Sequence, residues 1–495
     1  MLTITAREIA DLTGGLLTGG ADGSERVSGC AVIDSREAGA GDLFAALPGS
    51  RVDGHDYVSS AVAGGAALSL VSREVEHPAV LVDDVQEALS VLARAQLERA
   101  RRENPDLVVL AVTGSAGKTG AKDLIGLVLA AEGETIAPAG SLNNELGLPL
   151  TVLRLRETTR FLVLEMGARG IGHIAHLTGI ARPDVALVLN VGTAHLGEYG
   201  SVQAIAQAKG ELVEALKAGG RAVLNAEDPR VLAMAERSAA PVTTWGMYSG
   251  DVHTENLDLD ERARAVFDLV IPEGMSRLDG SLVPAGSYPM RPDLLGEHQA
   301  MNVVAAVTAA VVAGADPARA AETIDGARLP SSSRMQVHEA GESLLVDDAY
   351  NANPDSMRAA LRTLALMGRG RRTIAVLGEM LELGEESTRL HDEIGRLVVR
   401  LNISQLIVVG KGAAPIHQGA CLEGSFGGES IFTSSVDEAL TVLERMLAPG
   451  DVVLLKSSRD AGLRTLTAPL LAHLRVSDTE RAHTETPEKD GGAQA

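Results

Sequence analysis

A short glycine-rich segment holds the residues of this chain that are best suited to chemistry. Its residues are Gly114, Ser115, Ala116, Gly117, Lys118 and Thr119. Glycine lets the backbone wrap closely around an anion, so that the N–H groups of the loop point at it. The lysine can neutralise the β- and γ-phosphates of a nucleotide, and the threonine hydroxyl can bind Mg²⁺. We therefore expect a nucleoside triphosphate here, and the alternative is a glycine-rich turn that merely contains a lysine.

The segments on either side of the loop favour the phosphate interpretation. An apolar run over Leu107–Val112 precedes it, and a helical pattern over Lys122–Ala130 follows it. This order of strand, loop and helix places the loop at a helix N-terminus, where the helix dipole attracts anions. The spacing is the short form G-x-x-G-K-T, because the generic pattern has a further glycine near Val112.

Three more titratable residues lie in the same region. Glu165 ends the apolar run Phe161–Leu164, and ligands bind at the carboxyl ends of strands in open α/β sheets, so it is placed to hold Mg²⁺. His195 follows the next apolar run and could bind a metal through its neutral imidazole. Lys209 lies within a helical pattern. Taken alone, they are also typical of a solvated strand end, a structural histidine and an exposed helix face.

Two polar segments and two arginines complete the candidates. Ser141–Gly147 contains the paired Asn143 and Asn144, which suit recognition of hydroxyls or phosphates but also suit turns. Asp347–Pro354 follows a strand and offers carboxylates, amides and a phenol, with a helix N-cap as the competing interpretation. Arg334 and Arg459 could each bind a phosphate or a carboxylate through two hydrogen bonds, or form surface salt bridges.

The composition limits the function classes. The chain has 495 residues, too many for one ordinary core, and a formal net charge of −22, which disfavours non-specific binding to nucleic acid or to anionic membranes. Hydrophobic residues make up 45% but aromatic residues only 2%, which suits aliphatic cores with buried parallel strands. Two distant cysteines favour a reducing compartment, and we expect a cytoplasmic protein with no signal peptide and no membrane span.

The order of apolar runs predicts the fold class, which is α/β with three domains. The expected strands are Val108–Val112, Phe161–Leu164, Val185–Leu189, Ala222–Leu224, Leu344–Val346, Ile374–Leu377, Leu406–Val409 and Val452–Leu455. The expected helices are Val85–Arg102, Val202–Leu216, Gln299–Ala313, Asp355–Met367, Ser387–Leu401 and Val436–Met446. Alternation of this kind is typical of doubly wound parallel sheets. Residues 251–294 break the alternation and predict short β segments with turns.

The predicted domains are a small N-terminal α/β domain (1–105), a central parallel-sheet domain with the glycine loop (106–327) and a C-terminal Rossmann-like domain (328–476). The first boundary is placed at Asn104–Asp106, because a residue before proline disfavours helical geometry. A tail over 477–495 is rich in polar residues and has little to bury, so we expect it to be disordered.

Taken together, these segments resemble the Mur ligases, ATP-dependent amide-forming enzymes of bacterial cell-wall synthesis. The resemblance covers nearly the whole chain, from Asp34-Ser35-Arg36 through the glycine loop to Lys456-Ser457-Ser458-Arg459. The family has the same short G-x-x-G-K-T loop, usually followed by a serine or threonine, where this chain has Gly120. The resemblance implies ATP and two Mg²⁺ ions as cofactors.

Roles for the candidate residues follow from the same resemblance. Lys118 and Thr119 would hold phosphates and the first Mg²⁺, with Glu165 as its carboxylate ligand. His195 would serve the second Mg²⁺, and Lys209 matches a lysine that is carbamylated in several members. The remaining implied contacts are Asn302 to adenine, Arg334 and Asp348 to ribose and phosphate, Asp34, Ser35, Arg36 and Gly49 to a uridine-nucleotide substrate, and Asn143, Asn144, Tyr350, Asn351 and Asn353 to substrate.

Three segments favour the members that add D-alanyl-D-alanine to UDP-N-acetylmuramoyl-tripeptide. They are Ser141–Pro149, Asp347–Pro354 and Gly378–Gly384. Members that add diaminopimelate as the third amino acid carry an Asp-Asn-Pro-Arg tetrapeptide, which this chain lacks, and usually have histidine at the position of Asn351. We expect a monomer, and the net charge favours a protein without a nucleic-acid partner. A sister ligase for another amino acid and a non-catalytic ATP-binding relative are the alternatives.

Overall fold

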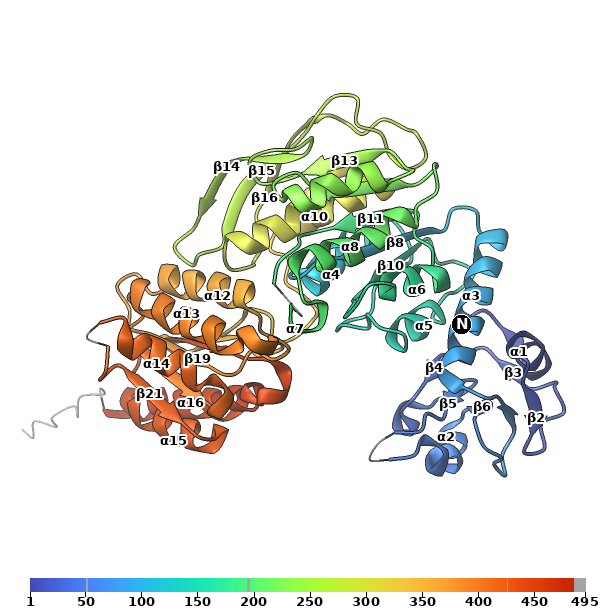
Figure 1. The fold of residues 1–495 in the computed structure, drawn as a ribbon, viewed down its shortest axis with the longest axis horizontal. Coiled ribbons are helices and arrows are strands. Elements are labelled where there is room, and N and C mark those ends of the chain that lie inside the picture. Colours follow the sequence, from blue (N-terminus) through green and yellow to red (C-terminus); the bar gives the residue numbers. More distant parts are fainter. Residues whose placement is uncertain (50–51, 194–195, 425, 485–495) are drawn as a thin grey trace, which may run out of the picture.

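The computed structural model describes residues 1–49, 52–193, 196–424 and 426–484. The chain forms three α/β bodies, and the N-terminal and C-terminal ones adjoin different ends of the central one (Figure 1). The expected boundary near residue 105 falls between α3 (Val85–Glu103) and β8 (Val108–Thr113), and that near 327 falls between α11 (Pro317–Ile324) and β17 (Gln336–Ala340). Among the described residues, no helix is both long and apolar enough to cross a membrane.

The N-terminal body is a small sheet with the order β2-β7-β6-β5-β4, in which only β2 runs antiparallel to its neighbour. Its elements are β1 (Ile4–Thr5), α1 (Ala6–Thr13), β2 (Leu16–Thr18), β3 (Arg26–Val27), β4 (Ala31–Val32), β5 (Leu43–Ala45), α2 (Val58–Gly64), β6 (Leu68–Val71) and β7 (Ala79–Leu81). Asp84 caps α3 by accepting the backbone N–H groups of Gln86 and Glu87, so the connecting helix begins where the sequence predicts.

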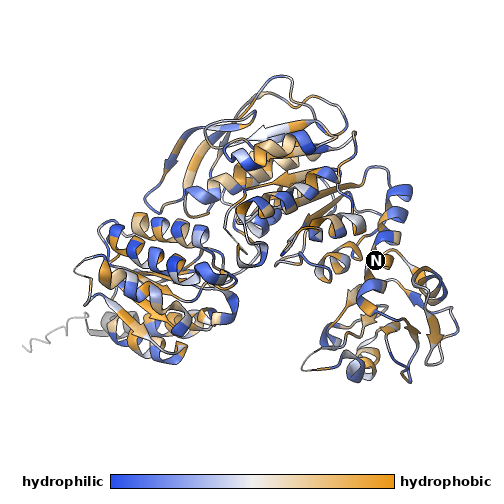
Figure 2. Ribbon diagram, viewed as in Figure 1, coloured by the Kyte–Doolittle hydropathy of each residue, from blue (hydrophilic) through white to orange (hydrophobic). Residues whose placement is uncertain are grey.

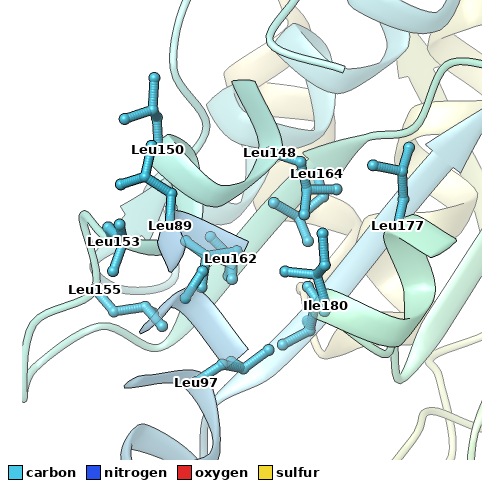
Figure 3. Packing of buried hydrophobic residues seen from close by; sticks show 14 of the residues in the cluster. Leu89, Leu97, Leu148, Leu150, Leu153, Leu155, Leu162, Leu164, Leu177 and Ile180 are labelled. Carbon is cyan, nitrogen blue, oxygen red and sulfur yellow. The ribbon is translucent and has the colours of Figure 1, made fainter. Parts of the chain in front are cut away.

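The connecting helix α3 packs against the central body through an apolar face. Figure 3 shows Leu89 and Leu97 of α3 among Leu148, Leu162 and Ile180 of the central body. Burying one leucine side chain stabilises the folded state by about 1.5–3 kcal/mol, so this shared core holds the first two bodies together.

The central body is a parallel sheet of six strands in the order β13-β12-β11-β8-β10-β9. Its elements are β8, α4 (Lys118–Ala130), β9 (Thr135–Ile136), α5 (Gly147–Val152), β10 (Phe161–Glu165), α6 (His173–Ile180), β11 (Val185–Val188), α7 (Leu196–Tyr199), α8 (Val202–Glu214), β12 (Arg221–Asn225), α9 (Pro229–Leu232) and β13 (Val242–Trp245). Figure 2 shows strands of the sheets in hydrophobic colours, as expected for strands covered on both faces. Strands β8, β10, β11 and β12 confirm the four strands that the sequence predicts for this region.

Residues 251–294 form the short β segments that their sequence predicts. They build an antiparallel sheet of β14 (His253–Leu259), β15 (Ala265–Ile271) and β16 (Gly286–Met290). Helix α10 (Glu297–Ala313) packs against α4 and the parallel sheet on one side and against β15 on the other. Because it is buried on nearly every side, its sequence is apolar all round rather than amphipathic.

The C-terminal body is a second six-stranded sheet, parallel except at its edge strand β17, in the order β17-β18-β22-β19-β20-β21. Its remaining elements are β18 (Ser343–Asp347), α12 (Pro354–Met367), β19 (Thr373–Leu377), α13 (Ser387–Arg400), β20 (Gln405–Val409), α14 (Ala414–Leu422), β21 (Ser430–Thr433), α15 (Val436–Met446), β22 (Val452–Lys456) and α16 (Thr467–Thr484). All predicted strands and helices of this region are present.

Two boundaries differ from the sequence prediction. Helix α4 begins at Lys118 rather than Lys122, because Gly117 adopts a left-handed conformation (φ 83°) that lets the helix start directly after the loop. Helix α16 continues past Val476 to Thr484, so the predicted disordered tail does not begin at residue 477. No glycine or proline occurs there before Pro487, and extending a packed helix costs little once it has nucleated.

Candidate active site

A cavity of about 820 Å³ separates the central body from the C-terminal body. Most of the predicted site residues line it, although they come from segments far apart in the chain. They are Ser115, Ala116, Gly117, Lys118, Thr119, Asn143, Asn144, Glu165, Lys209, Asn302, Arg334, Asp348, Tyr350, Asn351 and Asn353. His195 lies outside the described residues. The structure therefore brings the glycine loop and the Asp347–Pro354 segment to one space.

The glycine loop joins the end of β8 to the start of α4 and is held in a compact shape. The Lys118 ammonium donates a hydrogen bond to the carbonyl oxygen of Gly114 at 2.8 Å. A Cβ atom at Gly117 would lie 2.4 Å from Oδ1 of Asn302, so only glycine fits this position. The first-turn N–H groups of α4 have no partners within the helix and are available to an anion.

Asn190 braces this loop from the neighbouring strand. Its Oδ1 accepts the backbone N–H groups of Ser115 and Ala116, each at 3.0 Å, and its Nδ2 donates to the carbonyl oxygen of Ala116 at 3.2 Å. Asn190 was not predicted as a site residue. Its position directly after the apolar run of β11 is the signal that could have identified it.

Glu165 ends β10 beside the glycine loop and is surrounded by donors. It is only 3% exposed, and its Oε2 accepts the Thr119 hydroxyl at 2.7 Å. Its Oε1 accepts the Ser141 hydroxyl at 2.7 Å and the Asn143 amide at 2.8 Å. Ser141 was not predicted as a site residue, although it opens the polar segment that contains Asn143. These contacts fix the carboxylate at the cavity wall.

Two lysines of the cavity are electrostatically coupled. Lys209, on α8, is 4% exposed, and burial together with the nearby Lys118 ammonium lowers its pKa well below the usual lysine value. Burial also lowers the pKa of Lys118, while Glu165 opposes this shift and Arg334 adds to it. Burial therefore disfavours the charged form of Lys209, which is not the solvated lysine of an exposed helix face.

The C-terminal body contributes an ion pair and a stacked arginine. The buried Lys456 ammonium contacts the Asp348 carboxylate at 2.6 Å and donates to the carbonyl oxygen of Asn351 at 3.1 Å. The Arg334 guanidinium lies over the Tyr350 ring, 4.2 Å from its centre, and such stacking favours a planar cation. Arg334 therefore faces an aromatic ring rather than forming the surface salt bridge considered from the sequence.

His298, at the start of α10, also lines the cavity. Burial lowers the pKa of His298 to about 4, although Asp348 opposes this shift. The imidazole is therefore neutral at physiological pH, and it adds hydrogen-bonding capacity to the cavity without adding charge.

The central and C-terminal bodies touch at the rim of the cavity. Asp355, in the first turn of α12, accepts the backbone N–H of Thr193 at 3.2 Å and its hydroxyl at 3.3 Å. The Asn353 amide donates to the carbonyl oxygen of Ser115 at 3.5 Å. Arg169 of the central body pairs with Glu382 of the C-terminal body at 3.3 Å. The glycine loop is thus in direct contact with the third body.

The predicted uridine-nucleotide residues lie in the N-terminal body and do not line the cavity. Asp34 caps the short helix at Ser35–Glu37 and pairs with the Arg36 guanidinium, whose hydrogen bonds lower the pKa of Asp34 to about 2. The Arg36 side chain is 86% exposed, and the Gly49 N–H donates to the carbonyl oxygen of Val52 at 3.1 Å. These residues form a separate exposed surface.

The oxygen atoms of Glu165 and Thr119 suit a magnesium ion. Mg²⁺ is usually held by one or two carboxylates together with substrate phosphates and waters, rather than by a cage of protein ligands. Glu165 and the Thr119 hydroxyl supply such a partial set beside the glycine loop. Among the described residues there is no group of three or more His, Cys, Asp and Glu side chains that could hold a metal ion.

Three family models match successive parts of the chain. The first, described as Mur ligase family, catalytic domain, matches residues 30–97. The Mur ligase middle domain matches residues 112–310, and the Mur ligase glutamate ligase domain matches residues 333–459.

Full-length relatives and solved structures agree with these matches. The UDP-N-acetylmuramoyl-tripeptide–D-alanyl-D-alanine ligase of Mycobacterium tuberculosis strain H37Rv is 43% identical, over 95% of this chain and 98% of that protein. The ligase of the same name from Bacillus subtilis is 32% identical, over 95% and 99%. A crystal structure of MurF from Acinetobacter baumannii superposes with a TM-score of 0.81 at 30% identity, covering 95% of this chain and 99% of that one. MurF ligase from Thermotoga maritima in complex with ADP superposes with a TM-score of 0.74 at 27% identity, covering 91% and 98%.

Proposed function

This chain belongs to the Mur ligase family, and we propose that it joins D-alanyl-D-alanine to UDP-N-acetylmuramoyl-tripeptide at the expense of ATP, forming UDP-N-acetylmuramoyl-pentapeptide, ADP and phosphate. The observation that carries this function is the cavity itself. A phosphate-binding loop on the central body faces Asn351 and Asn353 of the C-terminal body across it. The geometry thus provides one space in which a nucleotide and an incoming amine can meet.

The chemistry requires activation of the tripeptide carboxylate. A carboxylate does not react with an amine at neutral pH, because oxide is a very poor leaving group. When a carboxylate oxygen attacks the γ-phosphorus of ATP, the bond to the β–γ bridging oxygen breaks and ADP leaves, giving an acyl phosphate. The dipeptide amine then attacks the acyl carbon, loses a proton and expels phosphate, which forms the amide bond.

Lys118 is the residue we propose to neutralise charge on the transferred phosphoryl group. Phosphoryl transfer depends mainly on positioning and on stabilisation of negative charge at the phosphate oxygens. The first turn of α4 offers N–H groups to the same oxygens. Contacts of Asn353 and Asp355 with the central body keep water away from the acyl phosphate, which water would otherwise hydrolyse.

We further propose that Glu165 and Thr119 hold one Mg²⁺ ion and that His195 and Lys209 serve a second. When bound, Mg²⁺ would neutralise phosphate charge that this acidic protein could not otherwise offset. The lowered pKa of Lys209 favours its neutral amine, whose nitrogen can attack the carbon of CO₂ and lose a proton, which gives a carbamate with carboxylate-like oxygens. Such a group would bind Mg²⁺, whereas an ammonium would repel it.

Three further assignments complete the proposal. The exposed surface around Asp34 and Arg36 binds the uridine nucleotide, and Asn302 contacts adenine beside the glycine loop. The protein acts as a monomer in the cytoplasm, where reduced Cys30 and Cys421 persist as free thiols. Sedimentation velocity at micromolar concentration tests the oligomeric state, and a predominant dimer would contradict the proposed monomer.

The direct test is phosphate release from ATP with purified protein, Mg²⁺ and UDP-N-acetylmuramoyl-tripeptide, with D-alanyl-D-alanine added or withheld. We expect release that requires both substrates, and a product heavier than the tripeptide substrate by the dipeptide less one water. Release with a shorter muropeptide and a single amino acid, but not with this pair, would identify a sister ligase. A protein that binds ATP but stays inactive with every acceptor would be a non-catalytic relative.

A further inference from the structure

The positive groups that line the cavity differ in what they contact. The contacts are Lys118 with the Gly114 carbonyl, Arg169 with Glu382, His173 with Glu145, Arg334 with the Tyr350 ring and Lys456 with Asp348. Lys209 is buried on α8, and burial lowers the pKa of both Lys209 and His298, that of His298 to about 4. Arg459 also lines the cavity, and no other described residue forms a hydrogen bond or ion pair with its guanidinium group.

The backbone that carries Arg459 is firmly held. Ser458, immediately before it, is 3% exposed and donates its backbone N–H to the carbonyl oxygen of Glu379 at 2.9 Å. The Ser458 hydroxyl accepts the N–H of Leu381 at 3.0 Å and donates to the carbonyl oxygen of Ala352 at 3.4 Å. Arg459 therefore presents an exposed, unpaired guanidinium from a fixed backbone position.

The topology places Arg459 where α/β sheets bind ligands. It follows β22, whose parallel neighbours are β18 and β19. Helix α12, after β18, packs in the core on one face of the sheet, whereas α16, after β22, packs in the core on the other face. The chain thus leaves neighbouring strands in opposite directions, which opens a crevice at their carboxyl ends, and crevices of this kind are the usual ligand sites of open α/β sheets.

We propose that Arg459 binds the C-terminal carboxylate of the incoming dipeptide. This inference rests on the proposed function, because it names the subsite that selects the second substrate. A guanidinium holds a carboxylate through two parallel hydrogen bonds, and an arginine without a protein partner avoids the cost of breaking an existing pair. In the proposed function, the N-terminus of α4 and Lys118 bind the phosphate groups on the opposite wall of the cavity. The unpaired guanidinium on the C-terminal body is therefore left for the carboxylate of the dipeptide.

The test compares D-alanyl-D-alanine with its C-terminal amide as the amine substrate. The amide keeps the attacking amine and both side chains but lacks the negative charge. We expect kcat/KM of the wild-type protein to be roughly ten- to hundredfold higher for the acid than for the amide. This ratio corresponds to the usual free energy of a hydrogen bond to a charged group. In Arg459→Ala this preference should fall to within about threefold, with the KM for ATP and that for the muramoyl substrate unchanged.

Two further variants separate recognition from a structural effect. Arg459→Lys keeps the charge but not the two parallel bonds, so it should retain part of the preference for the acid. Arg464→Ala removes an exposed arginine of the same segment that does not line the cavity, and it should behave as wild type. An Arg459→Ala protein that still prefers the acid as strongly as wild type, or whose KM rises for ATP instead, would overturn the proposal. If the wild type couples neither amine, the proposed function fails instead.

Discussion

The carboxylate of Asp123 accepts a hydrogen bond from the backbone N–H of Ser331 at 3.2 Å, which joins the helix after the glycine loop to the segment that leads into the C-terminal body. The same carboxylate pairs with the Lys122 ammonium at 2.7 Å, and Lys122 also donates to the carbonyl oxygens of Pro138 and Gly140. Both charged residues are only 2% exposed. One buried pair thus ties α4 to the interdomain segment and to the loop that leads to Ser141.

We expect Asp123→Ala to lower the free energy of unfolding by about 3–5 kcal/mol, because it leaves the Lys122 ammonium buried without its partner. Urea unfolding followed by circular dichroism measures this change. The double variant Lys122→Met/Asp123→Leu should recover most of the loss, since a buried pair can often be replaced by apolar side chains. Asp106→Ala, at an exposed aspartate, is the matched control. A single variant as stable as wild type would show that the pair contributes little.

The Lys118→Ala variant should lose ATP-dependent coupling by at least about a hundredfold, as is typical when a charge that stabilises a transition state is removed. Its fold should persist, because the lysine makes one hydrogen bond to Gly114 and no ion pair among the described residues. Phosphate release and thermal unfolding measured on the same preparation separate the two effects. Lys411→Ala, which removes an exposed lysine away from the cavity, should leave both unchanged. Retained activity in Lys118→Ala would contradict its assignment to phosphate.

The strands and helices that position the site could be predicted from the sequence where the local pattern of apolar and polar residues determines them. The strands of the two large sheets are apolar runs because they are covered on both faces, and their carboxyl ends are marked by polar residues such as Glu165. The start of α4 could not be placed, because it depends on the left-handed conformation of Gly117 in the folded loop, where Asn302 from a distant helix also leaves no room for a Cβ atom.

Contacts between segments far apart in the chain were beyond sequence reasoning. Asn190 braces the glycine loop, and Ser141 binds Glu165, through side chains that are equally typical of turns when seen in sequence alone. The pairing of Asp123 with Ser331 likewise has no local signal. The low pKa of Lys209 could not be inferred either, because it depends on burial and on Lys118 in the folded structure.

Arg36→Ala should raise the KM for the UDP-muramoyl substrate by about tenfold or more, the usual effect of losing a charged hydrogen bond. The KM for ATP and that for the dipeptide should not change, because Arg36 lies outside the cavity. The stability of the variant should match that of the wild type, since the pair of Arg36 with Asp34 is exposed. Steady-state kinetics with each substrate varied in turn provides the measurement. Arg26→Ala is the control at an exposed arginine of the same body, and an unchanged KM in Arg36→Ala would remove this residue from the uridine site.

Lys209→Met should abolish coupling and yet stabilise the apo protein at pH 7 in buffer free of CO₂. Burial and the nearby Lys118 lower the pKa of Lys209 in the native state, whereas the unfolded chain binds a proton there at every pH below its ordinary pKa of about 10.4. Since the unfolded state binds more protons, the wild-type protein loses about 1.4 kcal/mol of stability for each pH unit below that value, until the lowered pKa is reached. Methionine carries no such cost, so the variant should be more stable than the wild type at pH 7.

The pH dependence of that difference identifies its cause. Thermal unfolding of the wild type and of Lys209→Met should converge as the pH rises from 7 toward 10.4, because the amine then becomes neutral in both states. A difference that persists at high pH would reflect better packing by methionine instead of titration. Lys217→Met, at an exposed lysine just beyond α8, should show no difference at any pH. Equal stability of Lys209→Met and wild type at every pH would contradict a lowered pKa for Lys209 in the folded protein.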